Sequence, residues 1–543
     1  MSVEGQTASD DDAALNVEGK LTIESGGQLR ASQDAYFYVS GDIQYEGNAF
    51  VRSRSIFTLN GSSSQSVFNT GDTIDFKTYQ LIIDNPTSVV VNTINNATLD
   101  VFDILDVKQG NLITNDKLYI ESLLRTSPTR IFHGRVATLG PSASITGDAL
   151  IEKRVSNTDD GWRQLALPVE ATISSLSSSS ATFFVDGHTP KEQINTLWWD
   201  AGPSGTGDYA NGWTNANSTD GQLKAYAVFL SGTNGIHNLS NTFSFLGKLN
   251  EGDYTNSLSY QRDPADASAT IDEAIGWNFI PNPWPAYIDV FEFINNSTEF
   301  TSAYKAVHVW DAVNQQYRAI IGNGITKTDY NTDGSDLDTA STNIPTFQGF
   351  WVKATASSQT ANLIEATMRT TDIKDNALFM KREYPTIRLN IGDASNKSDQ
   401  LVLYFNENAS REFDYYGDAY FLRSQNENAF SFYGKEGQSK ASIISRKENQ
   451  KDSVEIFYEN PLSQSHFKIQ ADLSKAEQMN NVYLKDKSTG YIYNLEDGET
   501  LAFAHKSNST SPRFILYYSN NPTDFKGLVA QANSSIVAFI KDD

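Results

Sequence analysis

Short stretches in which apolar and polar residues alternate fill most of the chain. Clear examples are residues 15–17, 21–23, 37–39, 56–59 and 89–91. Alternation with a period of two is typical of half-buried strands, whereas helical spacing is scarce here. Asn-Gly, Asp-Gly and Ser-Gly pairs recur between the stretches, as expected of tight turns. The pattern predicts an all-β protein.

The first 155 residues show local repetition. The hexamer KLTIES at 20–25 nearly returns as KLYIES at 117–122, and residues 25–29 have an echo at 108–112. Repeated strand-and-corner units favour a β-solenoid-like repeat domain over residues 1–155, with roughly 20 residues per coil and about six or seven coils. An ordinary β-sandwich is the alternative for this stretch.

Residues 156–371 contain all eight tryptophans and an apparent duplication. Three aromatic segments have a counterpart further on, and these pairs are 161–165 with 276–280, 198–200 with 309–311, and 225–228 with 349–352. We therefore predict a Trp-rich, duplicated β-sandwich region, followed by a C-terminal β-sandwich over 372–520. Residues 521–543 are expected to form a polar linker and one last strand.

Charge and composition exclude several classes of protein. The net charge of −24 opposes binding to nucleic acid, because phosphate recognition needs clustered Lys and Arg. The chain has no cysteine, which excludes disulfide scaffolds and thiolate metal sites. It also has no 18-residue apolar run, so we expect no membrane span.

Several segments resemble the C-terminal part of Bacteroidota cell-surface proteins that are exported by type IX secretion. Residues 276–285 (GWNFIPNPWP) and 347–352 (FQGFWV) are similar to this family's "GWNLIGNPYP" and "QGFFV" segments, although Pro281 replaces the usual Gly. Residues 413–420 (FDYYGDAY) resemble "FDxxYDAYK", with Gly417 in place of Tyr. Residues 482–486 and 513–516 look like its "VYLxDxxTG…RFxLxF" hairpin. Residues 534–539 resemble the first strand of its sorting domain, so we expect a truncated sorting domain here.

The resemblance implies an extracellular or cell-surface location and the outer-membrane type IX secretion machinery as a partner. The resemblance says little about activity, because proteins of many functions share this region. We expect a structural or adhesive role. Further expected partners are a polysaccharide or a cell-surface protein.

One acidic loop has the spacing of a calcium site. Asp329, Asn331, Asp333 and Asp336 surround Gly334, so that alternate side-chain oxygens can converge on a hard cation. The Glu that closes such a loop is absent, since its position is Ala340. A plain, solvated acidic loop is the alternative to calcium as a cofactor.

An aromatic group is the candidate ligand site. Trp198, Trp199, Tyr209 and Trp213 flank a Gly- and Asn-rich loop, where flat rings can stack on sugars. This would make the region a carbohydrate-binding module of a polysaccharide-utilising surface protein. The alternative is that these rings fill a core, as most tryptophans do.

Nothing in the sequence marks a catalytic centre, so we expect no enzyme. The histidines are scattered, and no GxSxG elbow is present. A polysaccharide hydrolase or lyase remains the rival interpretation. It would require carboxyl groups with shifted pKa values, clustered along one face of the repeats.

Overall fold

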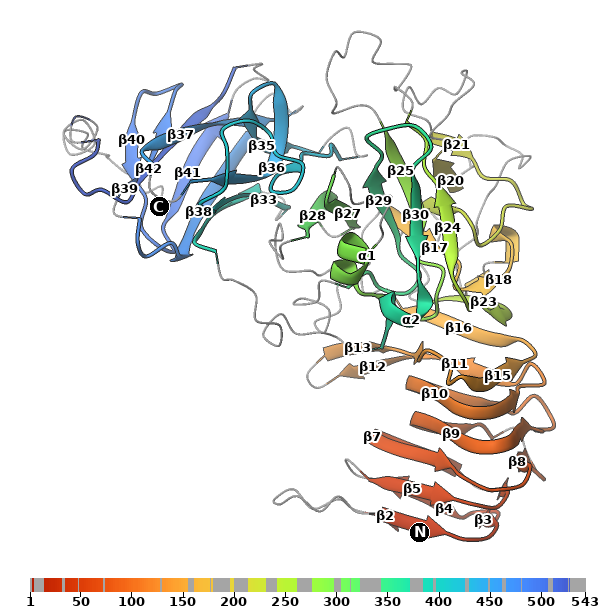
Figure 1. Ribbon diagram of the computed structural model, residues 1–543. Helices are drawn as coiled ribbons and strands as arrows, with labels where there is room; N and C mark the ends of the chain where they lie inside the picture. Colours follow the sequence, from red (N-terminus) through yellow and green to blue (C-terminus); the bar gives the residue numbers. More distant parts are fainter. Residues whose placement is uncertain are drawn as a thin grey trace.

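The computed structural model is nearly all β, which confirms the predicted class (Figure 1). The structure describes residues 2–3, 14–31, 35–46, 48–71, 74–126, 129–154, 161–175, 177–178, 196–199, 213–230, 242–260, 276–296, 304–312, 314–322, 343–371, 384–393, 397–424, 429–447, 450–460, 465–479, 481–505, 511–525 and 527. Within these ranges, no helix is both long and apolar enough to cross a membrane.

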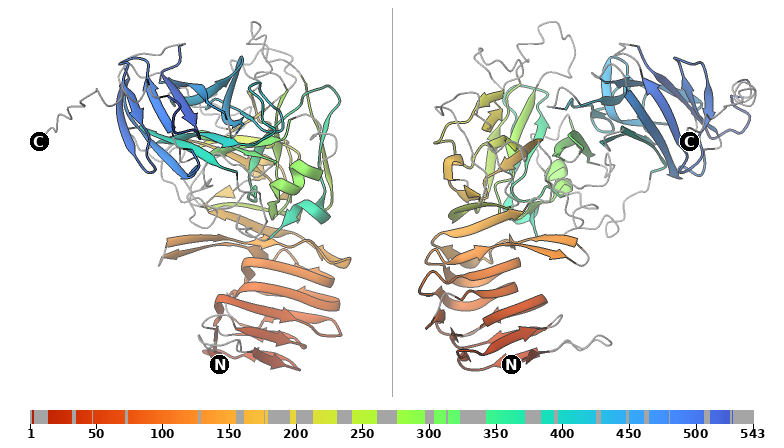
Figure 2. Two further views of the ribbon diagram at one scale, coloured as in Figure 1. Left: turned by 60° about the vertical axis from the view of Figure 1, so that its left-hand side comes forward. Right: turned by 180° about the vertical axis from the view of Figure 1, so that it is seen from behind.

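The N-terminal part consists of successive coils whose strands pair in parallel, and we call it the parallel stack (Figure 2). Strand β5, for example, pairs with β2 one coil before it and with β7 one coil after it, and β7 pairs in turn with β9. Its strands are β1 (Ser2–Val3), β2 (Ala14–Val17), β3 (Leu21–Ile23), β4 (Gln28–Ala31), β5 (Tyr36–Val39), β6 (Ile43–Tyr45), β7 (Asn48–Leu59), β8 (Gln65–Asn69), β9 (Phe76–Val91), β10 (Leu99–Ile113), β11 (Leu118–Ile120), β14 (Arg135–Val136), β15 (Ser142–Thr146) and β16 (Ala149–Arg154).

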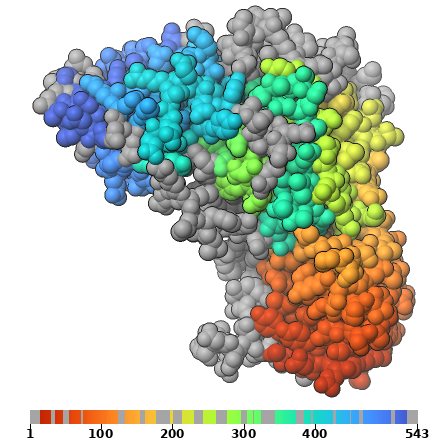
Figure 3. All heavy atoms as spheres, in the orientation of Figure 1, coloured from red at the N-terminus to blue at the C-terminus, as the bar shows by residue number. Residues whose placement is uncertain are grey.

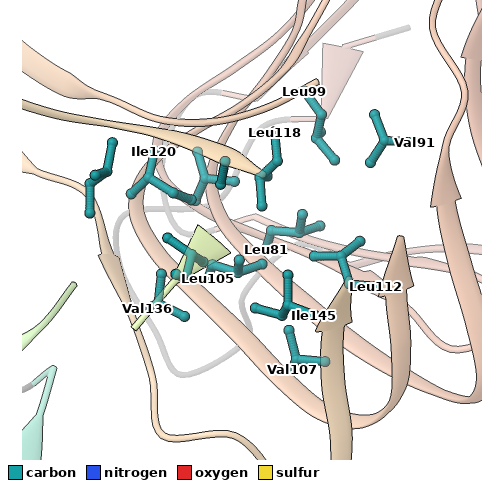
Figure 4. Close-up of a cluster of buried hydrophobic side chains, with 14 of the residues drawn as sticks. Leu81, Val91, Leu99, Leu105, Val107, Leu112, Leu118, Ile120, Val136 and Ile145 are labelled. Carbon is teal, nitrogen blue, oxygen red and sulfur yellow. The ribbon is translucent and has the colours of Figure 1, made fainter. Parts of the chain in front are cut away.

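Columns of apolar side chains fill the interior of the parallel stack (Figure 4). Alternation turns every second residue inward, so that equivalent residues of successive coils lie above one another, about 4.8 Å apart. Residue numbers along one column rise by 20 to 24 per coil and then by 31, because the hairpin β12 (Ser122–Thr126) and β13 (Thr129–His133) is inserted before the last coil. This column consists of Leu15, Phe37, Phe57, Leu81, Leu105 and Val136.

The last coil of the parallel stack is followed by an antiparallel strand. Strand β23 (Thr242–Leu249) pairs with β16, so that Ile151 lies opposite Phe245. The short strands β18 (Val169–Glu170) and β19 (Ser177–Ser178) also pair with β23. The edge of the parallel stack is therefore covered by a strand that comes from the next part of the chain.

Two four-stranded sheets follow, and they have the same strand order. In each, the first strand pairs with the fourth, the fourth with the second, and the second with the third. The first sheet contains β17 (Gly161–Ala166), β22 (Ala225–Leu230), β20 (Thr196–Trp199) and β21 (Trp213–Asn215), and the second contains β25 (Trp277–Pro281), β29 (Gly349–Lys353), β27 (Ala306–Asp311) and β28 (Gln316–Ile321). An equal order is what a duplication of one unit would produce.

Small elements surround these sheets. They are the 3-10 turn η1 (Ile173–Ser175), the helices α1 (Val290–Asn296) and α2 (Glu365–Met368), and the strand pairs β24 (Tyr254–Ser257) with β30 (Thr360–Leu363) and β26 (Tyr287–Ile288) with β31 (Arg369–Thr370).

The C-terminal part is one eleven-stranded sheet, which projects to one side of the molecule (Figure 3). Its strands are β32 (Thr386–Asp393), β33 (Ser398–Phe405), β34 (Ala419–Tyr420), β35 (Ser431–Glu436), β36 (Ser439–Arg446), β37 (Asp452–Glu459), β38 (Ser465–Lys475), β39 (Asn481–Asp486), β40 (Ile492–Asn494), β41 (Thr500–His505) and β42 (Phe514–Ser519).

Apolar clusters cross the boundaries that the sequence suggested at 155 and 371. One cluster joins the parallel stack to Leu165 and Phe245, and another joins the tryptophans of the paired sheets to Tyr404 and Tyr420 of the C-terminal sheet. The three parts are therefore packed against each other through buried side chains.

Candidate functional site

Two of the predicted ligand-binding rings lie between the paired sheets. Trp199 on β20 and Trp213 on β21 contact each other edge to face, with centroids 5.4 Å apart. Both also contact Trp351 of the second sheet, at 4.9 and 5.7 Å. Trp213 is buried and Trp199 is half-buried, so these rings pack one sheet against the other.

The third ring, Trp198, points the opposite way because neighbouring residues of a strand face opposite sides. It packs against the apolar cluster that extends from the parallel stack to the first of the paired sheets. The Nζ atom of Lys224 lies 3.7 Å from its ring centre and pairs with Asp220 at 2.7 Å. The three described tryptophans thus do not form one flat platform, and Tyr209 lies outside the described residues.

Hydrogen bonds between the paired sheets are reciprocal. The indole of Trp199 donates to the carbonyl of Trp277 at 3.0 Å, and the indole of Trp310 donates to the carbonyl of Trp162 at 2.9 Å. In the duplication inferred from the sequence, Trp199 corresponds to Trp310 and Trp162 corresponds to Trp277. Each half therefore makes the same bond to the other, as expected for two related units that face each other about a local two-fold axis.

The predicted calcium ligands Asp329, Asn331, Asp333 and Asp336 all lie outside the described residues. In the part of the chain that the structure describes, no group of three or more His, Cys, Asp or Glu side chains is arranged to hold a metal ion. Calcium at 329–336 stays a prediction.

The polar residues of the family-like segments satisfy backbone groups. The amide of Asn282 donates to the carbonyls of Ala286 and Pro345, each at 2.9 Å. The carboxylate of Asp418 accepts the backbone N–H of Ser445 at 2.6 Å and that of Asp414 at 2.8 Å. Buried polar groups paired in this way stabilise turns and strand junctions.

The polar residue of the family-like segment at 482–486 is also hydrogen-bonded within the fold. Asp486 ends β39, and its carboxylate accepts bonds from the backbone N–H and hydroxyl of Ser488, the hydroxyl of Thr489 and the guanidinium of Arg513. Asn282, Asp418 and Asp486 thus all form hydrogen bonds within the fold, and these bonds stabilise turns and strand junctions.

A group of charged residues lies on the outer face of the parallel stack. Lys77, Asp100 and Tyr119 are in register on successive coils. The Nζ atom of Lys77 lies 2.8 Å from Asp100 and 3.4 Å from Asp75. The hydroxyl of Thr98 donates to Asp100 at 2.6 Å, and Asp100 is fully buried beneath its neighbours.

Glu121 adds a further carboxyl group, two residues after Tyr119 on the same coil. Burial raises the pKa of Glu121 to about 8, and the negative charges of Asp100, Glu152 and Asp75 add to the increase. Burial also raises the pKa of Asp100. A carboxylic acid that keeps its proton at neutral pH beside other carboxylates is the combination that acid–base catalysis uses.

The sequence analysis did not identify this charged group. Its members are about one coil apart in sequence, so only the strand register brings them together. One sequence feature drew attention to Glu121, because this residue belongs to the KLYIES segment, a near-repeat of KLTIES.

Comparison with known proteins gives one match. The family model described as "Domain of unknown function (DUF8693)" matches residues 169–518, which is more than half of the chain. No curated protein and no solved structure matches. The matched range contains strand β23, both four-stranded sheets except β17, and the C-terminal sheet up to Tyr518.

Proposed function

The chain belongs to the family described as a domain of unknown function, DUF8693, and we propose that it is a structural or adhesive part of an extracellular cell-surface protein. The observation that carries this proposal is the use of the polar motif residues: Asn282, Asp418 and Asp486 all bind groups of the fold itself. Trp199 and Trp213 likewise pack between the sheets, and Trp198 packs against a second apolar cluster, which favours a rigid body over a sugar-binding module.

We infer a finer architecture as part of the same proposal. The parallel registers of 20 to 24 residues support a β-solenoid in the N-terminal part, which would act as a stiff spacer. The long, mainly antiparallel sheet of the C-terminal part has one parallel pairing, between β33 and β36, and its own apolar cluster, and it supports a β-sandwich.

Export by type IX secretion in Bacteroidota is the proposed route to the surface. Support comes from the family-like segments at 276–285, 413–420 and 482–516. The test is protease treatment of intact cells that produce the natural protein, in a wild-type strain and in a strain without the secretion machinery. We expect cleavage in wild-type cells and protection in the deletion strain, with a periplasmic protein protected in both. Protection in wild-type cells would contradict a surface location.

A second candidate function is favoured by the charged group on the parallel stack. Its clustered carboxyl groups, with the raised pKa of Glu121, are what the hydrolase or lyase interpretation requires. In this candidate, Glu121 donates a proton to the glycosidic oxygen, and a neighbouring carboxylate accepts a proton from the water that attacks the anomeric carbon, so that the glycosidic bond breaks. The measurement is the release of new reducing ends or unsaturated ends from neutral and acidic polysaccharides.

The matched variants are Glu121→Gln and Glu24→Gln. Glu24 has the equivalent place in KLTIES but is exposed. Activity that is lost only in Glu121→Gln supports the enzyme, whereas equal product yields in all three proteins, or none in the natural one, contradict it.

A further inference from the structure

We propose that the family-matched part of the chain acts as the C-terminal cap of a parallel β-stack, with β23 as the capping strand. The partner that this surface fits is the last coil of such a stack, here supplied by the same chain. This inference goes beyond the proposed surface role, because it assigns an interaction surface and a partner class to the DUF8693 region, and it holds for any route of export.

A stack of parallel strands has an inherent weakness at its ends. The last strand presents unpaired N–H and C=O groups, to which further strands can add. Here β23 pairs with all six residues of β16, from Ala149 opposite Gly247 to Arg154 opposite Thr242. Because β23 runs antiparallel and its other edge is partly occupied by β18 and β19, the parallel repeat stops at this point.

The capping strand also closes the apolar interior. Ile120, Ile151 and Phe245 are in register, so Phe245 continues an inward column of the coils. Phe243, Phe245 and Leu249 are at most 2% exposed and belong to the cluster that fills the parallel stack. Without a coil beneath them, these side chains would face water.

A second set of polar contacts, from other residues of the family-matched part, binds the backbone of the last coil at β14. The carbonyl of Val136 accepts two bonds from the guanidinium of Arg369, at 3.1 and 2.7 Å, and its N–H donates to the carbonyl of Pro285 at 2.8 Å. In the other direction, Arg135 of the coil donates to the carbonyl of Thr371 at 2.7 Å.

These contacts define the partner class. The family-matched part forms hydrogen bonds with both backbone groups of Val136 and pairs with the backbone edge of β16. Backbone recognition depends on the shape of a parallel coil more than on its side chains. The surface is therefore suited to stacks of varied sequence, provided that the last coil offers an apolar interior and a free edge.

The test is hydrogen exchange, followed by mass spectrometry, on the full chain with Phe245→Ala. Opening at a cap spreads coil by coil, since each coil contacts only its neighbours. We expect at least tenfold faster exchange in β16 and β15, with a smaller effect at each coil down to no change at β5. The control is Phe467→Ala, an equally buried change in the C-terminal sheet, which should leave the coils within twofold of the natural protein.

A milder variant covers the case in which Phe245→Ala fails to fold. Arg369→Met keeps the apolar stem but removes the bonds to Val136, and we expect about threefold to tenfold faster exchange in β14 and β16. Unchanged coil exchange in a folded cap variant would overturn the proposal. So would an equal increase in the coils and in the C-terminal sheet, because that would show global unfolding without a capping role.

Discussion

The parallel stack and the paired tryptophan sheets are both built from short strands, but they are held together by contacts of different range. In the parallel stack, Phe57 pairs with Phe37 and with Leu81, about one coil away on either side. In the paired sheets, Trp351 donates to Gln164, which lies 187 residues earlier, and Trp310 to Trp162, 148 residues earlier.

This difference predicts two modes of stability. In a stack where each coil contacts only its neighbours, the contact between two coils can be weakened while the contacts between the other coils remain. The paired sheets bury their rings only when both halves are in place, so a single loss affects all of their strands at once. The predictions below test this contrast. The side-chain truncations come first, from the largest expected loss of stability to the smallest, and a change of pH follows.

Truncation of Trp351 is expected to have the largest effect. The ring is 3% exposed and contacts Trp199, Trp213 and Phe279, and its indole bonds Gln164. Trp351→Ala should lower the free energy of unfolding of the paired sheets by about 4 kcal/mol. Urea unfolding followed by tryptophan fluorescence measures this, with the exposed Leu223→Ala as control. A loss below about 1 kcal/mol would argue against cooperative sheets.

A cavity in the middle of the parallel stack is expected to act locally. Leu105 is fully buried between Leu81 and Val136, and Leu105→Ala should cost about 3 kcal/mol. Hydrogen exchange should accelerate in the adjoining coils while the tryptophan fluorescence transition stays in place. A shift of that transition by the same amount would show that the two regions unfold as one unit.

The reciprocal indole bonds allow a direct comparison of the two halves. Trp199→Phe and Trp310→Phe each remove one bond, worth about 1 kcal/mol. Trp310 is fully buried and Trp199 half-buried, so we expect the greater loss for Trp310→Phe. Equal unfolding midpoints for both variants and the natural protein would contradict the pairing of equivalent groups.

The pH dependence of the parallel stack tests a charged residue in place of an apolar contact. The pKa of Glu121 is raised above its ordinary value to about 8, so the folded state holds a proton that the unfolded state releases. Its contribution to stability is present below pH 4.5 and is lost as the pH rises through 8. Glu121→Gln should flatten the fall in urea midpoint between pH 5 and 8.5, whereas the exposed Glu24→Gln should retain it.

Sequence repetition was an incomplete guide to equivalent positions. The similar segments KLTIES and KLYIES place β3 and β11 on different sides of the parallel stack, since β3 pairs with β6 while β11 pairs with β10 and β16. Similar strands and turns recur on every side of the parallel stack. A short repeated segment therefore indicates a similar local structure, but not an equivalent position in the stack. The charged group at Asp100 depends on register between coils, and its members have no common local pattern.

The sequence by itself determined the all-β class, the turns between strands and the pairs of aromatic segments in the middle of the chain, because alternation, turn residues and repeated motifs are local properties. Tertiary structure alone decided that β23 covers β16, that Trp198 and Trp199 face different cores, and that Lys77, Asp100 and Glu121 meet on one face. These features depend on which strands become neighbours, and that choice is made by burial over the whole chain, which no local pattern records.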